Sequence, residues 1–244
     1  MERLSYDLHI HSCLSPCADN DNTPNNILNM ARLNALDVIA LTDHNTAKNC
    51  PALIEARDRM ELPILVLCGM ELCCAEEIHI VCLFSALDNA LAFDQYVYST
   101  LPDISNRPDK FGNQLVLDAF DENALEEPRL LITASGISVN EIDLLMNRYE
   151  GVAFPAHVDR PSYSILSSLG AFPPECHFNC AELKDRSNYE LLSHKHPQLR
   201  SMNILTNSDA HYLWDIADGE HTMDVSSRSE QAVLAYIKGT NSLF

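Results

Sequence analysis

Short apolar segments alternate with amphipathic segments along the sequence, and this alternation constrains the fold more than any other feature. The apolar segments have the length of buried strands, and they lie at residues 6–11, 37–41, 64–70, 78–84, 152–157, 180–183 and 203–206. Helices are predicted between them, at residues 24–36, 51–60, 138–149 and 229–238. Repeated strand–helix units predict a parallel sheet or barrel, with functional groups at the carboxyl ends of its strands.

The alternation breaks after residue 84. Residues 85–137 are polar, contain three prolines and mix helix and loop signals. We therefore predict a barrel domain made of residues 1–84 and 138–244. Residues 85–137 are predicted to be an insertion of helices and loops that shapes the substrate site.

Glycine is scarce, and its distribution excludes several phosphate-binding motifs. The seven glycines are spread so that no two lie closer than 15 positions. A P-loop, a dinucleotide-binding turn and a nucleophile elbow each need clustered glycines, so none of them is present. Any phosphate chemistry would therefore depend on metal ions or on side chains.

The formal net charge is −19, from 35 acidic and 16 basic residues. Such a surface repels extended polyanions, so duplex nucleic acid is not expected as a partner. A small phosphorylated substrate, such as a nucleotide or a short oligonucleotide, can still be attracted by bound cations.

The cellular setting is predicted from what the sequence lacks. No apolar run is long enough to span a membrane, and no apolar leader opens the chain. The nine cysteines form an odd set without a C-x-x-C pair, which argues against a disulfide framework. We therefore expect a cytoplasmic protein that does not bind membranes.

Histidine and acidic residues gather in the first predicted strand. A period of two places Asp7, His9 and His11 on one face, with Leu8 and Ile10 on the other. Two imidazoles on one strand face can bind one metal ion, and a nearby carboxylate can orient one of them. Taken alone, the pair could equally be two packed or surface histidines.

The later strands end in the same kinds of residue. Acids and histidines follow or close the apolar segments at Asp43 and His44, Glu71, His157, and Asp209 and His211, and the fourth segment carries His79 between Ile78 and Ile80. Each instance alone has a structural alternative, such as an aspartate that caps a helix beside an incidental histidine. Together they predict a metal cluster at one edge of the sheet.

These stretches resemble the motifs of the PHP (polymerase and histidinol phosphatase) family of metal-dependent phosphoesterases, from Tyr6 to His211. The resemblance implies a distorted seven-stranded (β/α) TIM-like barrel that holds up to three metal ions. Its acidic character and insertion resemble the stand-alone branch, which acts on nucleotides or short oligonucleotides. By this resemblance Glu71 bridges two ions, and the full set of metal ligands is His9, His11, Asp19, His44, Glu71, His79, His157, Asp209 and His211.

The loop after the first strand departs from the family pattern. The family loop is His-Thr-x-x-Ser-Asp-Gly, placed shortly before a Thr-Pro helix start, and this chain has three extra residues there. Counting back four from Thr23 selects Asp19 as the ligand. Counting forward from His11 selects Pro16, which cannot ligate a metal, or Cys17. We take Asp19 as the predicted ligand and keep Cys17 as the alternative.

Two further residues are predicted to serve the reaction. Asp43 is expected to handle protons or to support a ligand, rather than to bind metal itself. Arg160 lies three residues after His157, where the family often places a basic group near the phosphate. The alternative for Arg160 is a surface ion pair with an acid such as Asp159.

The combined prediction is a phosphoesterase with two to three divalent ions, of manganese, zinc or iron, in a trinuclear centre. A hydroxide that bridges the ions would attack a nucleotide-like or short-oligonucleotide phosphate ester. The alternatives are a histidinol-phosphate-type phosphomonoesterase and a catalytically silent metal-binding module.

Overall fold

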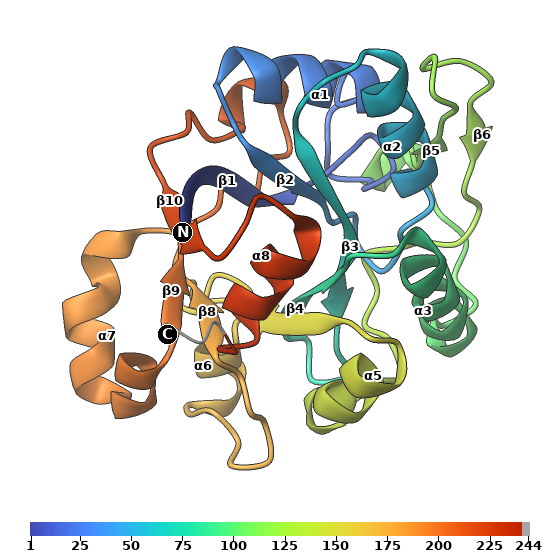
Figure 1. Cartoon of the computed structure of the whole chain (residues 1–244). Helices are drawn as coiled ribbons and strands as arrows, with labels where there is room; N and C mark the ends of the chain where they lie inside the picture. Colours follow the sequence, from blue (N-terminus) through green and yellow to red (C-terminus); the bar gives the residue numbers. More distant parts are fainter. Residues whose placement is uncertain (241–244) are drawn as a thin grey trace.

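A curled sheet flanked by helices forms the body of the protein in the computed structural model, which describes residues 1–240 (Figure 1). The last four residues of the predicted 138–244 segment lie outside the described residues. The strands are β1 (Glu2–Ile10), β2 (Val38–Leu41), β3 (Leu65–Cys73), β4 (His79–Phe84), β5 (Leu115–Val116), β6 (Leu125–Glu126), β7 (Val152–Pro155), β8 (Cys180–Glu182), β9 (Asn203–Leu205) and β10 (Thr222–Val225). The helices are α1 (Pro24–Leu33), α2 (Cys50–Arg59), α3 (Leu87–Thr100), α4 (Pro108–Phe111), α5 (Ile142–Arg148), α6 (Ile165–Leu169), α7 (Tyr189–Lys195) and α8 (Glu230–Ile237).

Local sequence signals start the helices where they were predicted. The Thr23 side chain accepts a hydrogen bond from the Asn26 N–H, and Pro24 occupies the first position of α1. Ser138 and Glu141 form a capping box just before α5. These contacts satisfy N–H groups that the first turn would otherwise leave unpaired.

Seven strands surround the centre of the molecule. The order β10-β1-β2-β3-β4-β7 forms one sheet, and β8 and β9 form a parallel pair. The Val158 N–H donates to the Glu182 carbonyl (2.8 Å) and the His11 N–H donates to the Ala210 carbonyl (3.0 Å), which joins this pair to β7 and β1. The distorted seven-stranded TIM-like fold is therefore confirmed, with β10 added to the outer half of β1.

The sheet is not wholly parallel, which corrects the prediction. Strands β1, β2 and β3 are parallel, but β4 runs antiparallel to both of its neighbours, and β10 runs antiparallel to β1. Residues 74–78, which join β3 to β4, are too few for a crossover, so the chain must turn back as a hairpin. The amino end of β4 consequently lies beside the carboxyl end of β3.

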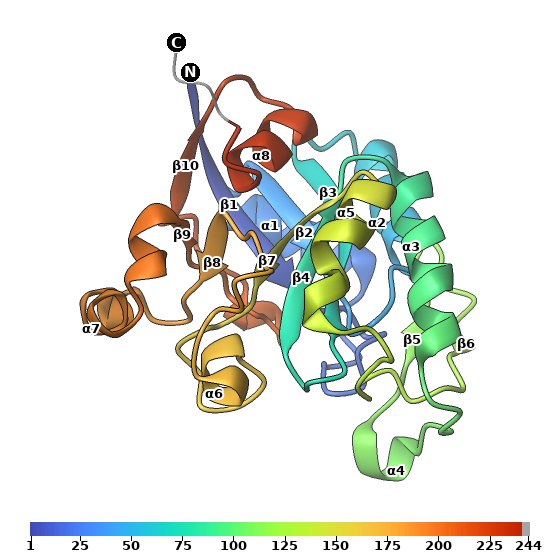
Figure 2. The same ribbon diagram turned by 90° about the horizontal axis from the view of Figure 1, so that it is seen from below.

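Two large apolar clusters hold the strands and helices together. The cluster inside the barrel includes Leu8, Leu67 and Phe154 and is closed at one end by α8. The other lies between the sheet and the outer helices, and it includes Ile39 and Phe93. Figure 2 shows α2, α3 and α5 on one side of the sheet and α7 beside β8 and β9.

The segment 85–137 has two parts. Helix α3 buries Phe93 in the outer cluster, where its ring lies 5.4 Å from that of Phe84, so α3 packs as the other barrel helices do. The remainder, with α4, β5 and β6, lies at the side of the barrel (Figure 2). The division into domain and insertion stays a prediction.

Within residues 1–240, no helix combines the length and the apolar character needed to cross a bilayer. All nine cysteines lie in this range, and each has a free thiol.

Candidate metal centre

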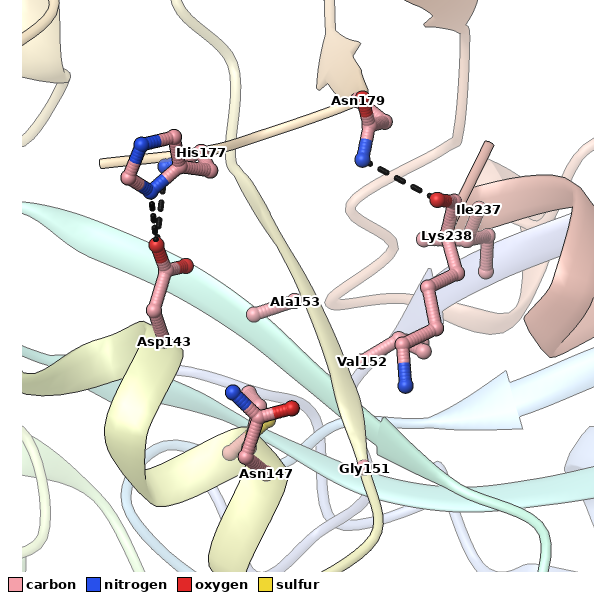
Figure 3. Close-up of a pocket in the computed structure, with 10 residues that line it drawn as sticks. Asp143, Asn147, Gly151, Val152, Ala153, His177, Asn179, Ile237 and Lys238 are labelled. Atoms are coloured by element: carbon pink, nitrogen blue, oxygen red, sulfur yellow. Dashed lines mark hydrogen bonds and ion pairs between the residues drawn. The ribbon is translucent and has the colours of Figure 1, made fainter. Parts of the chain in front are cut away.

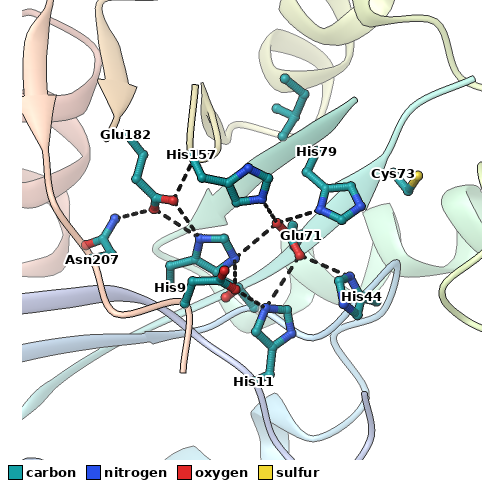
Figure 4. A network of polar contacts seen from close by, with 12 residues as sticks. His9, His11, His44, Glu71, Cys73, His79, His157, Glu182 and Asn207 are labelled. Carbon is teal, nitrogen blue, oxygen red and sulfur yellow. Dashed lines mark hydrogen bonds and ion pairs between the residues drawn. The ribbon is translucent and has the colours of Figure 1, made fainter. Parts of the chain in front are cut away.

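The carboxylate of Glu71, on β3, lies at the centre of a cluster of imidazoles (Figure 4). Five imidazole nitrogens lie within 3.4 Å of its two oxygens: His9 Nε2 (3.2 Å), His11 Nε2 (3.4 Å), His44 Nδ1 (3.0 Å), His79 Nδ1 (2.9 Å) and His157 Nε2 (3.1 Å). The Glu71 side chain is 1% exposed. Residues from four strands or strand ends thus converge on one buried carboxylate.

Asp209 and His211 complete the cluster from the segment after β9. Asp209 Oδ1 lies 3.3 Å from His11 Nε2 and 3.5 Å from His9 Nε2, and the His211 ring stacks on the His11 ring at 4.2 Å. The backbone φ angles of His157 and Asp209 are +29° and +48°, in the region that residues other than glycine rarely adopt. Such strained positions are concentrated at functional sites.

His79 reaches the cluster by a different route from the one predicted. It is the first residue of β4, so it lies at the amino end of its strand and not at the carboxyl end. It pairs with Cys73 across the β3–β4 hairpin. Because β4 runs antiparallel, its amino end meets the carboxyl ends of the parallel strands. The reversal of β4 is therefore what places His79 beside Glu71.

Glu182, at the end of β8, is a site residue that the sequence analysis missed. It is fully buried, and its carboxylate accepts hydrogen bonds from His9 Nδ1 (3.0 Å), the His157 N–H (3.0 Å) and Asn207 Nδ2 (2.7 Å) (Figure 4). A carboxylate only accepts, so His9 carries its proton on Nδ1 and presents the Nε2 lone pair to the cluster. The signal that could have found Glu182 is an acid at the end of a predicted strand.

Asp7 was expected to share a face with His9 and His11, and this was wrong. The pairing of β1 with β2 shifts between Asp7 and Ile10, which marks a bulge, so the alternation of side chains does not continue through it. The Asp7 carboxylate instead accepts from the N–H groups of Ala217 (3.0 Å) and Ser208 (3.1 Å). Glu182, and not Asp7, is the carboxylate that orients His9.

A second set of hydrogen bonds orients His11. Its Nδ1 lies 3.0 Å from Ser15 Oγ, which donates to Asp43 Oδ1 (2.7 Å). Asp43 also accepts from the Ser12 N–H (2.7 Å) and the Ser12 hydroxyl (2.6 Å), so both of its oxygens hold the loop after β1. Burial raises the pKa of Asp43, and these donors partly offset the shift. The geometry supports a positioning role for Asp43; proton handling stays a prediction.

Neither Cys17 nor Asp19 belongs to the candidate metal groups found among the described residues, so the loop ligand of the third predicted position stays a prediction. The imidazoles of His44 and His211 lie close enough to Cys17 to lower the pKa of its thiol. Asp19 Oδ1 accepts from the Asp21 N–H (2.8 Å). The three extra loop residues turn the Asp19 carboxylate toward its own loop. Asp19 as a ligand has no geometric support.

The charges of the cluster depend on one another. Burial alone would raise the pKa of Glu71, but the imidazoles of His79, His9 and His44 outweigh it and hold the pKa well below its usual range. Burial lowers the pKa of His9, but the carboxylates of Glu182, Glu71 and Asp209 raise it above its usual value. Burial and two neighbouring imidazoles lower the pKa of His11.

The donor set fits divalent metal ions. Three combinations of side chains can each supply at least three ligand atoms within 4.8 Å of one another: His9, His11, Glu71 and Asp209; His44, Glu71 and His79; and His11, His44 and His211. Within the described chain, His9 Nε2, His11 Nε2, His44 Nδ1 and Glu71 Oε2 are buried without a hydrogen-bond partner. Buried polar atoms normally have one, so lone pairs that converge in this way indicate ligation.

Arg160 lies at the rim of the cluster. Its Nη1 is 3.2 Å from Asp209 Oδ2, and its side chain is 42% exposed in a cavity of about 170 Å³. Tyr163 lines the same cavity and stacks on His79 at 4.7 Å. The ion pair predicted as the alternative for Arg160 thus exists, but its partner is Asp209 rather than Asp159.

A larger cavity, of about 270 Å³, lies away from the cluster between α5, β7 and α8 (Figure 3). Two of its polar side chains are paired within it, since His177 Nδ1 lies 2.8 Å from Asp143 and Asn179 donates to the Lys238 carbonyl. It contains no member of the cluster, so the chemistry belongs at the smaller cavity.

A barrel with histidine and carboxylate ligands at the carboxyl ends of its strands defines the class of metal-dependent hydrolases. Residues 7–159 match the PHP domain family, and the chain belongs to that family. No protein with a curated description matches the sequence significantly.

Solved structures share the fold at low sequence identity. The lesion-specific endonuclease Endonuclease Q from Pyrococcus furiosus is 17% identical, with a TM-score of 0.65 over 99% of this chain and 57% of the endonuclease. A protein from Bifidobacterium adolescentis, assigned as a metal-dependent phosphoesterase, is 15% identical, with a TM-score of 0.59 over 97% of this chain and 96% of its own. The chain thus spans little more than half of Endonuclease Q.

The expectation that duplex nucleic acid is excluded as a partner was wrong. Endonuclease Q has also been solved with a 27-mer duplex that carries an abasic lesion at the active site; that chain is 16% identical, with a TM-score of 0.61 over 99% of this chain and 58% of its own. A protein that contains a barrel of this fold therefore binds a duplex. Net charge is a property of the whole surface, whereas binding depends on the local field at the site.

Proposed function

We propose that the protein is a metal-dependent phosphoesterase that hydrolyses phosphate esters of a nucleotide-like or short-oligonucleotide substrate. One observation carries the proposal: the buried Glu71 carboxylate lies within 3.4 Å of five imidazole nitrogens, next to a cavity that holds a half-exposed arginine. Membership of the PHP domain family supports the same class of reaction.

The residues that would hold ions fall into three groups. We propose His9, His11, Glu71 and Asp209 for the first ion, Glu71, His79 and His157 for the second, and His44, His211 and Cys17 for the third. Imidazoles and carboxylates suit Mn²⁺, Zn²⁺ or Fe²⁺, and a thiolate at the third position favours zinc or iron over manganese. Ions bound there would neutralise charge on the phosphate and lower the pKa of water at the site.

The remaining residues position these ligands and the substrate. Glu182 and Ser15 accept from the Nδ1 atoms of His9 and His11, so both Nε2 atoms face inward. Arg160 presents a planar guanidinium that can bind two phosphate oxygens once Asp209 engages a metal. Asp43 would act through Ser15, by fixing the ring of His11. All nine thiols are free, which supports the proposed cytoplasmic location.

The test is an assay of protein loaded with Mn²⁺, Zn²⁺ or Fe²⁺ against nucleoside, sugar and amino-alcohol phosphates and short oligonucleotides. We expect turnover of nucleotide esters, and its loss in Glu71→Gln. Preference for an amino-alcohol phosphate would favour the histidinol-phosphate-type alternative. If no loaded form hydrolysed any phosphate ester, the proposed function would be overturned.

A further inference from the structure

Two aromatic side chains are exposed directly after the cluster residue His211. The rings of Tyr212 and Trp214 stack at a centroid distance of 5.0 Å and an interplanar angle of 16°. Tyr212 is 40% exposed and Trp214 is 73% exposed, although large aromatic side chains are usually mostly buried. The sequence analysis assigned no role to either residue.

Tyr212, the residue after His211, lines a cavity of about 360 Å³. Cys17 and Asp19 line the same cavity, and the Asp19 N–H donates to the His211 carbonyl (2.9 Å), so a ligand there lies next to the third proposed metal position. The cavity is separate from the one that holds Arg160 and Tyr163. One cavity thus offers a guanidinium, and the other offers the exposed ring of Tyr212, which stacks on Trp214.

The rest of the cavity wall carries hydrogen-bonding groups. Asn20 and Asn113 line it, and the Asn113 amide donates to Asn20 Oδ1 (3.1 Å). Each amide has further donors or acceptors of the kind that bind the edge of a planar heterocycle. The wall therefore combines a flat aromatic face with amide edges.

The cavity is built by the close approach of two segments. Gly112, at the end of α4, has a φ of +96°, and a Cβ atom there would lie 2.0 Å from the Pro16 carbonyl oxygen. Only glycine allows this contact between the predicted insertion and the loop after β1. The side of the cavity that carries Asn113 is thus fixed against the side that carries Cys17.

We propose that this cavity, together with Tyr212 and Trp214, binds a nucleobase of the substrate whose phosphate lies at the metal centre. Bases stack on exposed aromatic side chains, and one such contact contributes about 1–3 kcal/mol. The occupant is the base of a nucleotide or an unpaired base of a strand, since stacking needs a free face. This inference rests on the proposed function, because it places the phosphate at the cluster.

Trp214 is the only tryptophan of the chain, so its fluorescence reports on the stacked pair that it forms with Tyr212. The zinc-loaded protein is titrated with a phosphonate analogue of adenosine monophosphate, whose C–P bond cannot be hydrolysed, and with methylphosphonate, which has no base. We expect the adenosine analogue to change the fluorescence and to bind about 10- to 100-fold more weakly to Tyr212→Leu. Tyr212→Phe keeps the ring and should bind as the unchanged protein does.

The base-free probe and the metal content separate the outcomes. Calorimetry should give the same methylphosphonate affinity for all three proteins, and elemental analysis the same zinc content. If Tyr212→Leu bound both probes equally more weakly, or bound the adenosine analogue normally, the subsite would be overturned. If binding of the adenosine analogue depended on Tyr212 but no ester were hydrolysed, the proposed function would be overturned and the subsite would be supported. If esters were hydrolysed but the Tyr212 variants bound the analogue normally, the subsite would be overturned and the proposed function would be supported.

Discussion

Glu182 accepts a hydrogen bond from His9 Nδ1 at 3.0 Å, although the two residues are 173 positions apart. Both side chains are fully buried. Because the carboxylate keeps the proton on Nδ1, Nε2 stays free to bind an ion. We expect Glu182→Gln to weaken zinc binding by about 10- to 100-fold, the usual effect of losing such a partner. Competition with a chromophoric chelator measures the zinc affinity of each protein.

The matched control is Glu190→Gln, which alters an exposed glutamate in the first turn of α7. Its zinc affinity should equal that of the unchanged protein. An unchanged affinity in Glu182→Gln would show that the negative charge of Glu182 contributes nothing to zinc binding through His9.

The fold and most of the cluster could be predicted because their signals are local. A strand that ends in an acid or a histidine is visible in a few residues, and parallel strands bring such ends together. Glu182 carries the same signal at the end of β8, but its role depends on His9, and no local pattern shows that pairing.

Other residues could not be placed from the sequence, and the reason is different for them. Counting positions in a loop does not reveal which side chains turn inward, so the choice between Asp19 and Cys17 stays a prediction. The bulge in β1, which turns Asp7 away from His9, depends on pairing with β2 and leaves no mark in the alternation of residues. The reversal of β4 was predictable, since five residues cannot form a crossover.

Arg160 is expected to contribute to substrate binding and not to metal binding. Loss of a charge-assisted contact costs about 1.5–3 kcal/mol, so Arg160→Ala should lower kcat/KM by about 10- to 100-fold. The kcat/KM of Arg160→Lys should lie between those of Arg160→Ala and the unchanged protein, because lysine keeps the charge but cannot make the bidentate contact. Steady-state kinetics with elemental analysis checks this.

Metal content should be the same in both Arg160 variants, and Arg148→Ala, at an exposed position of α5, should keep full activity. A drop in bound metal in Arg160→Ala would instead assign the arginine to holding Asp209 in place.

The Cys17 thiol should react at lower pH than an ordinary cysteine. Burial raises its pKa, but the imidazoles of His44 and His211 outweigh this and lower the pKa to about 6. The thiolate, which is the reactive form, therefore predominates above about pH 6 and is lost as the pH falls below it. Alkylation of the metal-free protein by iodoacetamide, followed by mass spectrometry across pH 5–9, measures the midpoint.

Cys176 is the internal control, since burial raises the pKa of its thiol to about 11 and it should stay unreacted at neutral pH. Zinc should protect Cys17 if the thiolate is a ligand. Rapid alkylation at saturating zinc would remove Cys17 from the proposed third position.

Metal binding should stabilise the folded protein. An ion at a hundred times its dissociation constant adds about 2.7 kcal/mol, which corresponds to a rise in Tm of about 5–10 °C for a chain of this size. Differential scanning calorimetry of chelated and zinc-loaded protein measures it. The His157→Ala variant should keep its fold without zinc, but zinc should raise its Tm by less than it raises the Tm of the unchanged protein.

The same variant separates an enzyme from a silent metal-binding module. Activity should fall by at least a hundredfold in His157→Ala, while circular dichroism of the metal-free variant stays that of the parent. Full activity with reduced zinc stabilisation would place the ions in a structural role.

The hairpin between β3 and β4 has a consequence for how the centre is assembled during synthesis. Glu71 and His79 are eight positions apart and lie 2.9 Å from each other, so they meet as soon as this hairpin closes. Asp209 emerges from the ribosome more than a hundred residues later. A nascent chain therefore presents two adjacent ligands to a cation well before the barrel can close around it. The first ion that binds there can be kept or exchanged while the remaining ligands are still being synthesised.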